Sequence, residues 1–330
     1  MRPLSRACRL LFRRGDRAQP SPGPAAACFM RSRIGIGLLL ALAFPVAANA
    51  ACPPTGQTRD SLRALRSAKW ALADATQRQA LAIGLLDCLA SPDPLLRDDI
   101  AFEGLQHWLR AGALDPATVR RIADLLLPRV TPEALAADVH GVAAPFAALA
   151  LAEVARVDRR TPLYSPAERE AFVQAAARFL ASVRDYRGFD PKDGWRHGVA
   201  HGADWLLQLS LNPALDRRQL DRLLDAIATQ VLPPGSHSYV FGEGQRLMQP
   251  VLYIAARGLH DAAFFTAWLG RIAAAAAWPV GQPLSQAALS RTHNARGFLW
   301  PLYVAVQESP DPPLRARLLP GLQAALRALP

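Results

Sequence analysis

The sequence predicts an all-α protein, a helical-repeat or α/α superhelical array built from antiparallel helix pairs. Over most of the chain after residue 76, apolar residues recur at spacings of three and four, which places them on one face of an α-helix. The alternation of apolar and polar residues that marks a β-strand is nearly absent. Capping residues that precede a proline, as at Ser165-Pro166, mark new helix starts along the chain. Ten or more helices in series favour an array over a four-helix bundle.

The predicted helices follow one another with short connections. Their ranges are 77–90, 95–111, 117–128, 144–157, 166–183, 195–211, 216–231, 245–257, 262–277, 284–290 and 312–328. Three segments rich in Gly, His, Arg or aromatic residues are predicted to be irregular, namely 185–194, 233–244 and 291–298. Irregular loops on a helical scaffold often carry function, so these segments are the places to look for a site.

The N-terminal 50 residues are predicted to lie outside the fold. Residues 34–48 form a short apolar run that follows two arginines and ends in a small-x-small sequence, which is typical of a secretory signal. We therefore expect residues 30–50 to be a signal peptide and 1–29 an over-extended or disordered leader. Residues 51–330 are then a single all-helical domain, periplasmic or secreted, with no membrane span after cleavage.

The net charge does not indicate a nucleic-acid-binding protein. The whole chain carries +11, of which the eight Arg and one Asp of residues 1–50 contribute +7, so that +4 remains on the predicted mature part. That charge is spread without a dense basic block. Two cysteines, Cys52 and Cys88, remain after cleavage, and the sequence leaves open whether they form a disulfide in an oxidising compartment.

The densest group of functional side chains lies in residues 184–205. A helix there would carry His197, His201 and Asp204 on a single face. Two imidazoles and a carboxylate at this spacing could hold a divalent metal, the one cofactor that the motif suggests. They could instead form an acid–base pair in which Asp204 orients a histidine. The alternative is a structural polar seam between helices.

Three further groups surround this motif in the sequence. Asp99 and Glu103 share a predicted helix face, which is either solvated or opposed to the histidines across a groove. Asp185 precedes the motif and could pair with Arg187 or cap the following helix. In the loop from residue 237 onward, Glu243 and Arg246 are spaced to pair on one helix. His293, Asn294 and Arg296 form a weaker polar group.

The chain resembles a bacterial family known as domain of unknown function 2785. The resemblance rests on LLRDDIAFEGL at 95–105, RGF at 187–189 with GWRHGVAHGAD at 194–204, and GEGQRL at 242–247, and it spans roughly residues 85–260. It implies a wholly helical fold and brings no established activity.

These observations lead to one main functional hypothesis and two alternatives. The main hypothesis is an exported protein that binds a ligand or protein partner in a polar–aromatic groove. The groove would be lined by Asp99, Glu103, Asp185, Arg187, Trp195, His197, His201, Asp204, Glu243 and Arg246. The first alternative is a hydrolase in the same groove, metal-assisted or using a carboxylate–histidine pair, with glycans as one candidate substrate. Its candidate catalytic residues are His197, His201, Asp204 and Glu103. In the second alternative, every motif is structural.

Overall fold

The computed structural model describes residues 52–278, 281 and 283–330, and within this part the protein is an all-α array. The predicted leader and signal peptide lie outside the described residues. The described residues belong to one compact unit, 49–330. No helix among the residues that the structure describes is long and apolar enough to cross a membrane.

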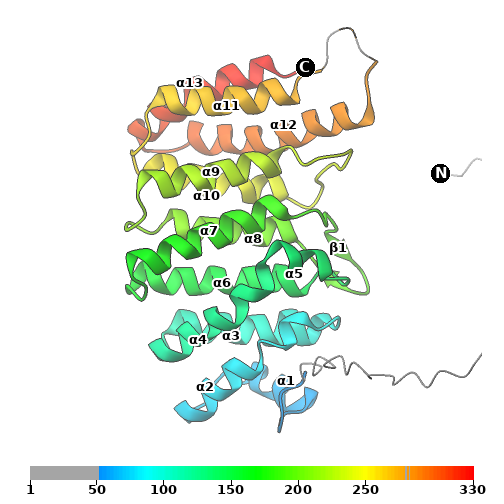
Figure 1. Cartoon of the computed structure of the whole chain (residues 1–330), viewed down its shortest axis with the longest axis vertical. Coiled ribbons are helices and arrows are strands. Elements are labelled where there is room, and N and C mark those ends of the chain that lie inside the picture. Colours follow the sequence, from blue (N-terminus) through cyan, green and yellow to red (C-terminus); the bar gives the residue numbers. More distant parts are fainter. Residues whose placement is uncertain (1–51, 279–280, 282) are drawn as a thin grey trace, which may run out of the picture. The chain divides into compact units, whose positions relative to one another are not determined.

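Most of the α-helices follow the predicted ranges, whereas the helices at 59–67 and 132–137 and the second half of the helix at 286–307 were not predicted (Figure 1). They are α1 (Arg59–Ser67), α2 (Ala75–Gly84), α3 (Glu103–Ala111), α4 (Pro116–Leu126), α5 (Pro132–Ala137), α6 (Ala143–Arg160), α7 (Pro166–Ser182), α8 (Gly198–Ser210), α9 (Arg217–Val231), α10 (Glu243–Ala256), α11 (Ala262–Ala276), α12 (Gln286–Gln307) and α13 (Pro312–Ala328). Short helical segments of other types are η1 (Cys88–Ala90), η2 (Leu95–Phe102) and η3 (Leu127–Val130). Two short antiparallel strands, β1 (Phe189–Asp190) and β2 (Gly194–Trp195), form a hairpin.

The predicted caps explain several of the helix starts. The Asp115 side chain accepts from the backbone N–H of Thr118 at the start of α4. Ser165 and Glu168 form a reciprocal capping box at the start of α7. These side chains satisfy backbone N–H groups that have no partner in the first turn of a helix. The caps visible in the sequence therefore act locally, as expected.

Two predictions about secondary structure were wrong. Residues 291–298, predicted to be irregular, lie inside α12. Their polar side chains are compatible with a helix because several of them bind neighbouring segments instead of competing for the backbone of α12. In addition, α8 begins at Gly198, three residues after the predicted start at 195, because Gly194 and Trp195 pair in the hairpin.

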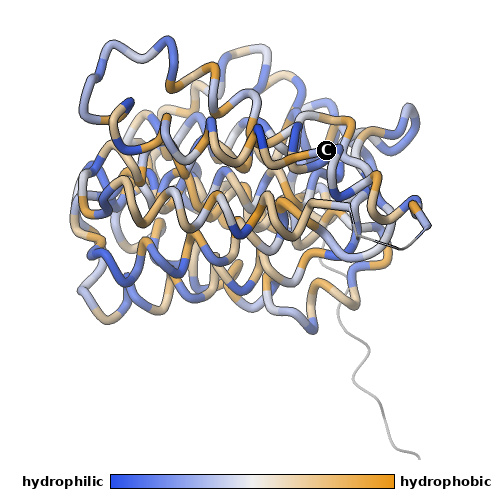
Figure 2. The backbone as a smooth tube through the Cα atoms, turned by 90° about the horizontal axis from the view of Figure 1, so that it is seen from above, coloured by the Kyte–Doolittle hydropathy of each residue, from blue (hydrophilic) through white to orange (hydrophobic). Residues whose placement is uncertain are grey.

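Helices α3, α6, α8, α10 and α12 form one layer, in which each helix packs on the next. Helix α4 packs on α6, α7 packs on α8, and α9 packs on both α8 and α10. Figure 2 shows polar and apolar stretches alternating along the helices, as expected where one face of each helix is buried. The interior includes the fully buried Trp108, Trp205 and Trp268. The β1–β2 hairpin and the α9–α10 connection lie at the same end of the helices (Figure 1).

A disulfide joins Cys52 to Cys88, which settles the question that the sequence left open. It ties the segment before α1 to η1.

Candidate functional site

The loop between α7 and α8 carries the central motif and is held firmly against the helices. Arg97, a side chain with no exposed surface, donates to the backbone carbonyls of Asp193 and Trp195. Asp190 accepts from the backbone N–H groups of Lys192 and Asp193 and closes the hairpin turn. These bonds fix the hairpin, so its aromatic side chains are presented from a constrained backbone.

Asp185 and Arg187 form an ion pair in this loop, one of the two roles that the sequence allowed for Asp185. Arg187 also donates to the carbonyl of Val139, 3.3 Å away, and Arg196 donates to the carbonyl of His140. The segment before α6 is therefore joined to the motif loop. The sequence did not predict the contacts of Arg187 and Arg196 with this segment, because neither Val139 nor His140 belongs to a recognisable motif.

His197 precedes α8 and has a left-handed backbone, with φ of 53°. Its ring lies 4.1 Å from that of Trp195 and 6.0 Å from that of His201, measured between centroids. His201 lies in the first turn of α8, is 7% exposed, and meets Phe146 edge-on. The two histidines are therefore neighbours, although His197 is not part of the helix that the sequence predicted for it.

Both imidazoles are uncharged at neutral pH. Burial lowers the pKa of His197 to about 4, and the positive charge of Arg246 adds to the effect. Burial also holds the pKa of His201 well below its usual value. The Nδ1 atoms of both rings are buried and have no hydrogen-bond partner among the described residues. A neutral imidazole has one nitrogen that donates and one that accepts, so each ring could bind a neutral polar group.

Asp204 is bound by Arg246 of α10 through both carboxylate oxygens, with Nε of the arginine 2.8 Å from Oδ1. Burial raises the pKa of Asp204, and Arg246 opposes this rise. Within the described ranges, no group of three or more His, Cys, Asp or Glu side chains is placed to hold a metal ion. The structure therefore does not assemble His197, His201 and Asp204 as the predicted ligand set, because the arginine occupies the carboxylate.

The pair between Asp204 and Arg246 is one step in a ladder of polar contacts between successive helices. Arg159 of α6 donates to Gln208 of α8, and Arg110 of α3 donates to Glu153 of α6. At the N-terminal end of the ladder, Arg66 of α1 donates to both Asp99 and Glu103. Arg66 therefore binds both of the carboxylates that were predicted to face the histidines across a groove. The ladder supports the polar-seam interpretation for these acidic residues and for Asp204.

Glu243 does not pair with Arg246, contrary to the sequence expectation. Its carboxylate accepts from the backbone N–H of Phe241, 2.9 Å away, and the residue is 3% exposed. The ring of Phe241 lies directly over Gly188, where an added Cβ would come within 1.9 Å of the ring. Glu243 thus holds the backbone of Phe241, and the missing side chain of Gly188 leaves room for its ring beside the hairpin.

The rest of the α9–α10 connection is fixed by α12. Asn294 accepts from the backbone N–H of Tyr239 and donates to the carbonyl of His237. His293 contacts the carbonyl of Tyr239, and Ser290 donates to the carbonyl of Ser236. The polar group at 293–294 is therefore structural, and it holds the loop that ends at Phe241.

The two loops together expose a cluster of apolar side chains, which we call the aromatic patch. Trp195 lies 5.0 Å from Phe189 and 5.8 Å from Phe241 between ring centroids. These three rings are 38%, 49% and 39% exposed, and the neighbouring Val240 is 68% exposed. Side chains of this size in contact with one another usually shield each other inside a core, so their shared exposure singles out this surface. Sequence inspection included only Trp195 of this cluster among its site residues.

A family described as "Protein of unknown function (DUF2785)" matches residues 138–304, which include the aromatic patch and both of its loops. The chain belongs to this family. The match extends further toward the C-terminus than the resemblance seen in the sequence and does not include the segment 95–105. No curated protein and no solved structure matches the chain.

Proposed function

We propose that this DUF2785 protein binds a protein partner through the aromatic patch. The observation that carries the proposal is the exposure of Phe189, Trp195 and Phe241 in mutual contact on a fixed backbone. Aromatic residues are enriched at the centres of protein interfaces, where they provide large contact areas at a low entropic cost. The backbone bonds of Arg97 and Glu243 hold the two loops before a partner arrives, which lowers the cost of ordering them.

The shape of the patch favours a protein over a small molecule. Small ligands bind in concave sites that cover most of their surface. Among five cavities of about 250 to 500 Å³ in the described part of the chain, none is lined by Phe189, Trp195 or Phe241. The hydrolase alternative has less support at this site, because Arg66 and Arg246 bind the carboxylates that it requires.

We also propose that the protein acts outside the cytoplasm. The signal-like sequence at 30–50 and the disulfide between Cys52 and Cys88 both support this, because disulfides persist in oxidising compartments. N-terminal sequencing of the protein recovered from the cell envelope fraction would test it. A mature start near residue 51 is expected, whereas a start at Met1 or Met30 in the cytoplasmic fraction would contradict it.

The binding proposal is tested by comparing Trp195→Ala with Trp300→Ala. Trp300 is also an exposed tryptophan, 55% accessible on α12, and it lies outside the patch. Each variant and the wild type are immobilised and exposed to envelope extract of the source cells. A partner retained by the wild type and Trp300→Ala but lost by Trp195→Ala is then purified, and its affinity is measured directly.

Truncation of a central interface aromatic is expected to weaken that affinity by about 30-fold or more. Equal retention by the two variants would contradict the proposal, as would a purified partner whose affinity is unchanged by Trp195→Ala. Circular dichroism of both variants excludes a loss of fold as the cause.

A further inference from the structure

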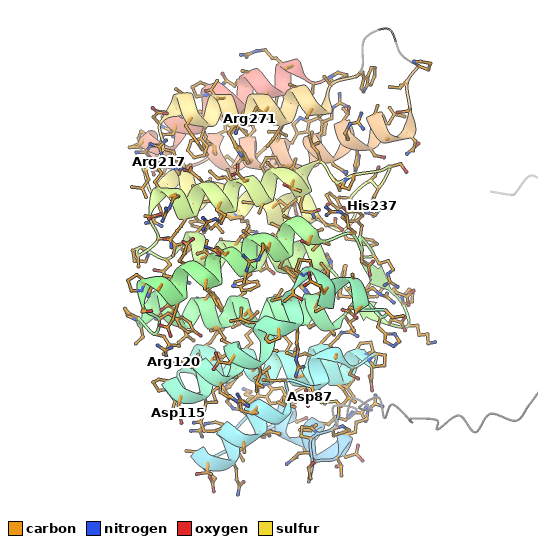
Figure 3. The ribbon with its side chains drawn as sticks, in the orientation of Figure 1. Asp87, Asp115, Arg120, Arg217, His237 and Arg271 are labelled. Atoms are coloured by element: carbon orange, nitrogen blue, oxygen red, sulfur yellow. A yellow bond between two sulfur atoms is a disulfide. The ribbon has the colours of Figure 1, made fainter. Side chains whose placement is uncertain are left out.

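The largest cavity of the five lies between α4 and α7, away from the aromatic patch. Its volume is about 500 Å³, within the range of small-molecule sites. Helix α4 ends at Leu126, and the chain then continues through η3 and α5, both of which pack on α7. The cavity is lined by α4, this connecting segment and α7. In Figure 3, Arg120 of the cavity and His237 near the patch lie on opposite sides of the view, so the two surfaces are separate.

The cavity has an apolar wall. Leu127, Val130, Phe172 and Ala175 all line it, and Val130 and Phe172 are 2% and 4% exposed. Tyr164 stacks on Phe172 with 5.6 Å between ring centroids and extends this wall. An apolar part of a ligand that bound here would therefore be transferred from water to an apolar surface that is already formed.

The charges along the cavity are distributed unevenly. At the Tyr164 end, Arg120 is bound to Glu168 and to the carbonyl of Leu163, and its guanidinium lies 5.0 Å from the Tyr164 ring centroid. Asp124 lies one turn after Arg120 on the same face of α4 and adds a negative charge there. This end of the cavity is therefore unfavourable for an anion.

Arg178 provides the opposite charge farther along α7. It lies ten residues after Glu168, which is about 15 Å along a helix. Its guanidinium donates to the neutral Gln174 side chain at 3.4 Å, and no described carboxylate lies within ion-pair distance. The cavity thus has an unpaired cation at one end of an apolar wall, and a negative charge at the other.

We propose that this cavity binds an amphipathic carboxylate, with its apolar chain along Leu127, Val130 and Phe172 and its carboxylate at Arg178. A charge-assisted hydrogen bond to Arg178 gives the orientation, and Asp124 disfavours the reverse orientation. The cavity is separate from the aromatic patch, so a negative result for carboxylate binding would not bear on the proposal of a protein partner, and the reverse also holds.

Isothermal titration of the full mature protein with decanoate tests the proposal. Decyltrimethylammonium serves as the cation with the same chain, and acetate as the carboxylate without one. Decanoate is expected to bind, and the other two are expected to bind at least tenfold more weakly. Arg178→Gln is expected to weaken decanoate binding by about tenfold. Arg271→Gln on α11 serves as the matched control, because Arg271 is also exposed and lies well apart from Arg120 (Figure 3).

A second variant tests the cavity itself. Ala175→Trp fills the space beside the apolar wall and is expected to abolish decanoate binding. The absence of decanoate binding to the wild type would overturn the proposal. Equal effects of Arg178→Gln and Arg271→Gln, or equal affinity for the cationic amphiphile, would do the same. Arg178 is exposed, so Arg178→Gln remains a valid test even if Ala175→Trp does not fold.

Discussion

Replacement of Gly244 by alanine tests the close contact between α10 and α12, next to the α9–α10 connection that carries Phe241. Gly244 lies in the first turn of α10, and an added Cβ would lie 2.4 Å from the carbonyl oxygen and 2.6 Å from the carbonyl carbon of Gly297 on α12. Both obstructing atoms belong to the backbone and cannot rotate aside. Pro301, four residues after Gly297, has no N–H to donate to that carbonyl, so α12 presents it without its usual helical partner.

The magnitude follows from two opposing effects. Ordinary carbon contacts are about 3.5 Å, so α10 and α12 must separate locally by about 1 Å. Overpacking of this kind costs about 1–3 kcal/mol, and an obstruction by rigid backbone falls at the upper end of that range. Alanine recovers at most about 1 kcal/mol of helix propensity. We therefore expect Gly244→Ala to lower the free energy of unfolding by about 2 kcal/mol.

Gly270→Ala is the matched control for this measurement. Gly270 lies inside α11, is exposed, and has no atom within 4 Å of an added Cβ. At this position alanine gains helix propensity and meets no obstruction, so Gly270→Ala is expected to be more stable than the wild type by about 1 kcal/mol. In thermal unfolding followed by circular dichroism, Tm should fall by about 5 °C for Gly244→Ala and rise by about 2 °C for Gly270→Ala. Equal stability of the two variants would refute the packing argument.

Three further predictions concern the disulfide, the ladder and the first histidine. The Cys52–Cys88 disulfide has a sequence separation of 36, and replacing both cysteines by serine should lower the free energy of unfolding by about 4 kcal/mol in urea titrations. Unchanged stability would contradict a stabilising role for the disulfide. Asp204→Asn should cost about 2 kcal/mol in the same assay, because it leaves Arg246 without its charged partner, and a neutral effect would show that the pair contributes little. Because the folded-state pKa of His197 is lowered to about 4, stability is lost as the pH falls from about 6.5 toward 4. His197→Gln should therefore lose less stability than the wild type over that interval, and equal losses would show that His197 does not contribute to the acid sensitivity.

Some features of the candidate site were visible in the sequence because they depend on local chemistry. The segment around Trp195 and His197 was identified from its density of functional side chains, and it does lie on a loop at one end of the helices. The pair between Asp185 and Arg187 spans two residues and was among the foreseen possibilities. In contrast, Phe189 and Phe241 belong to two separate polar–aromatic loops in the sequence, and their shared exposure beside Trp195 arises only where the folded loops meet.

The sequence by itself determined the all-α class, most helix boundaries and several caps, because helical periodicity and capping act over a few neighbouring residues. The tertiary structure decided which partner each charged side chain finds. Arg246 lies three residues from Glu243 yet binds Asp204, which is 42 positions away, and Asp99 is bound by Arg66 from another helix. Such choices depend on how separate helices pack, and a one-dimensional spacing does not contain that information. The same reason explains why a motif that resembled a metal site proved to contribute its carboxylate to an interhelical ladder.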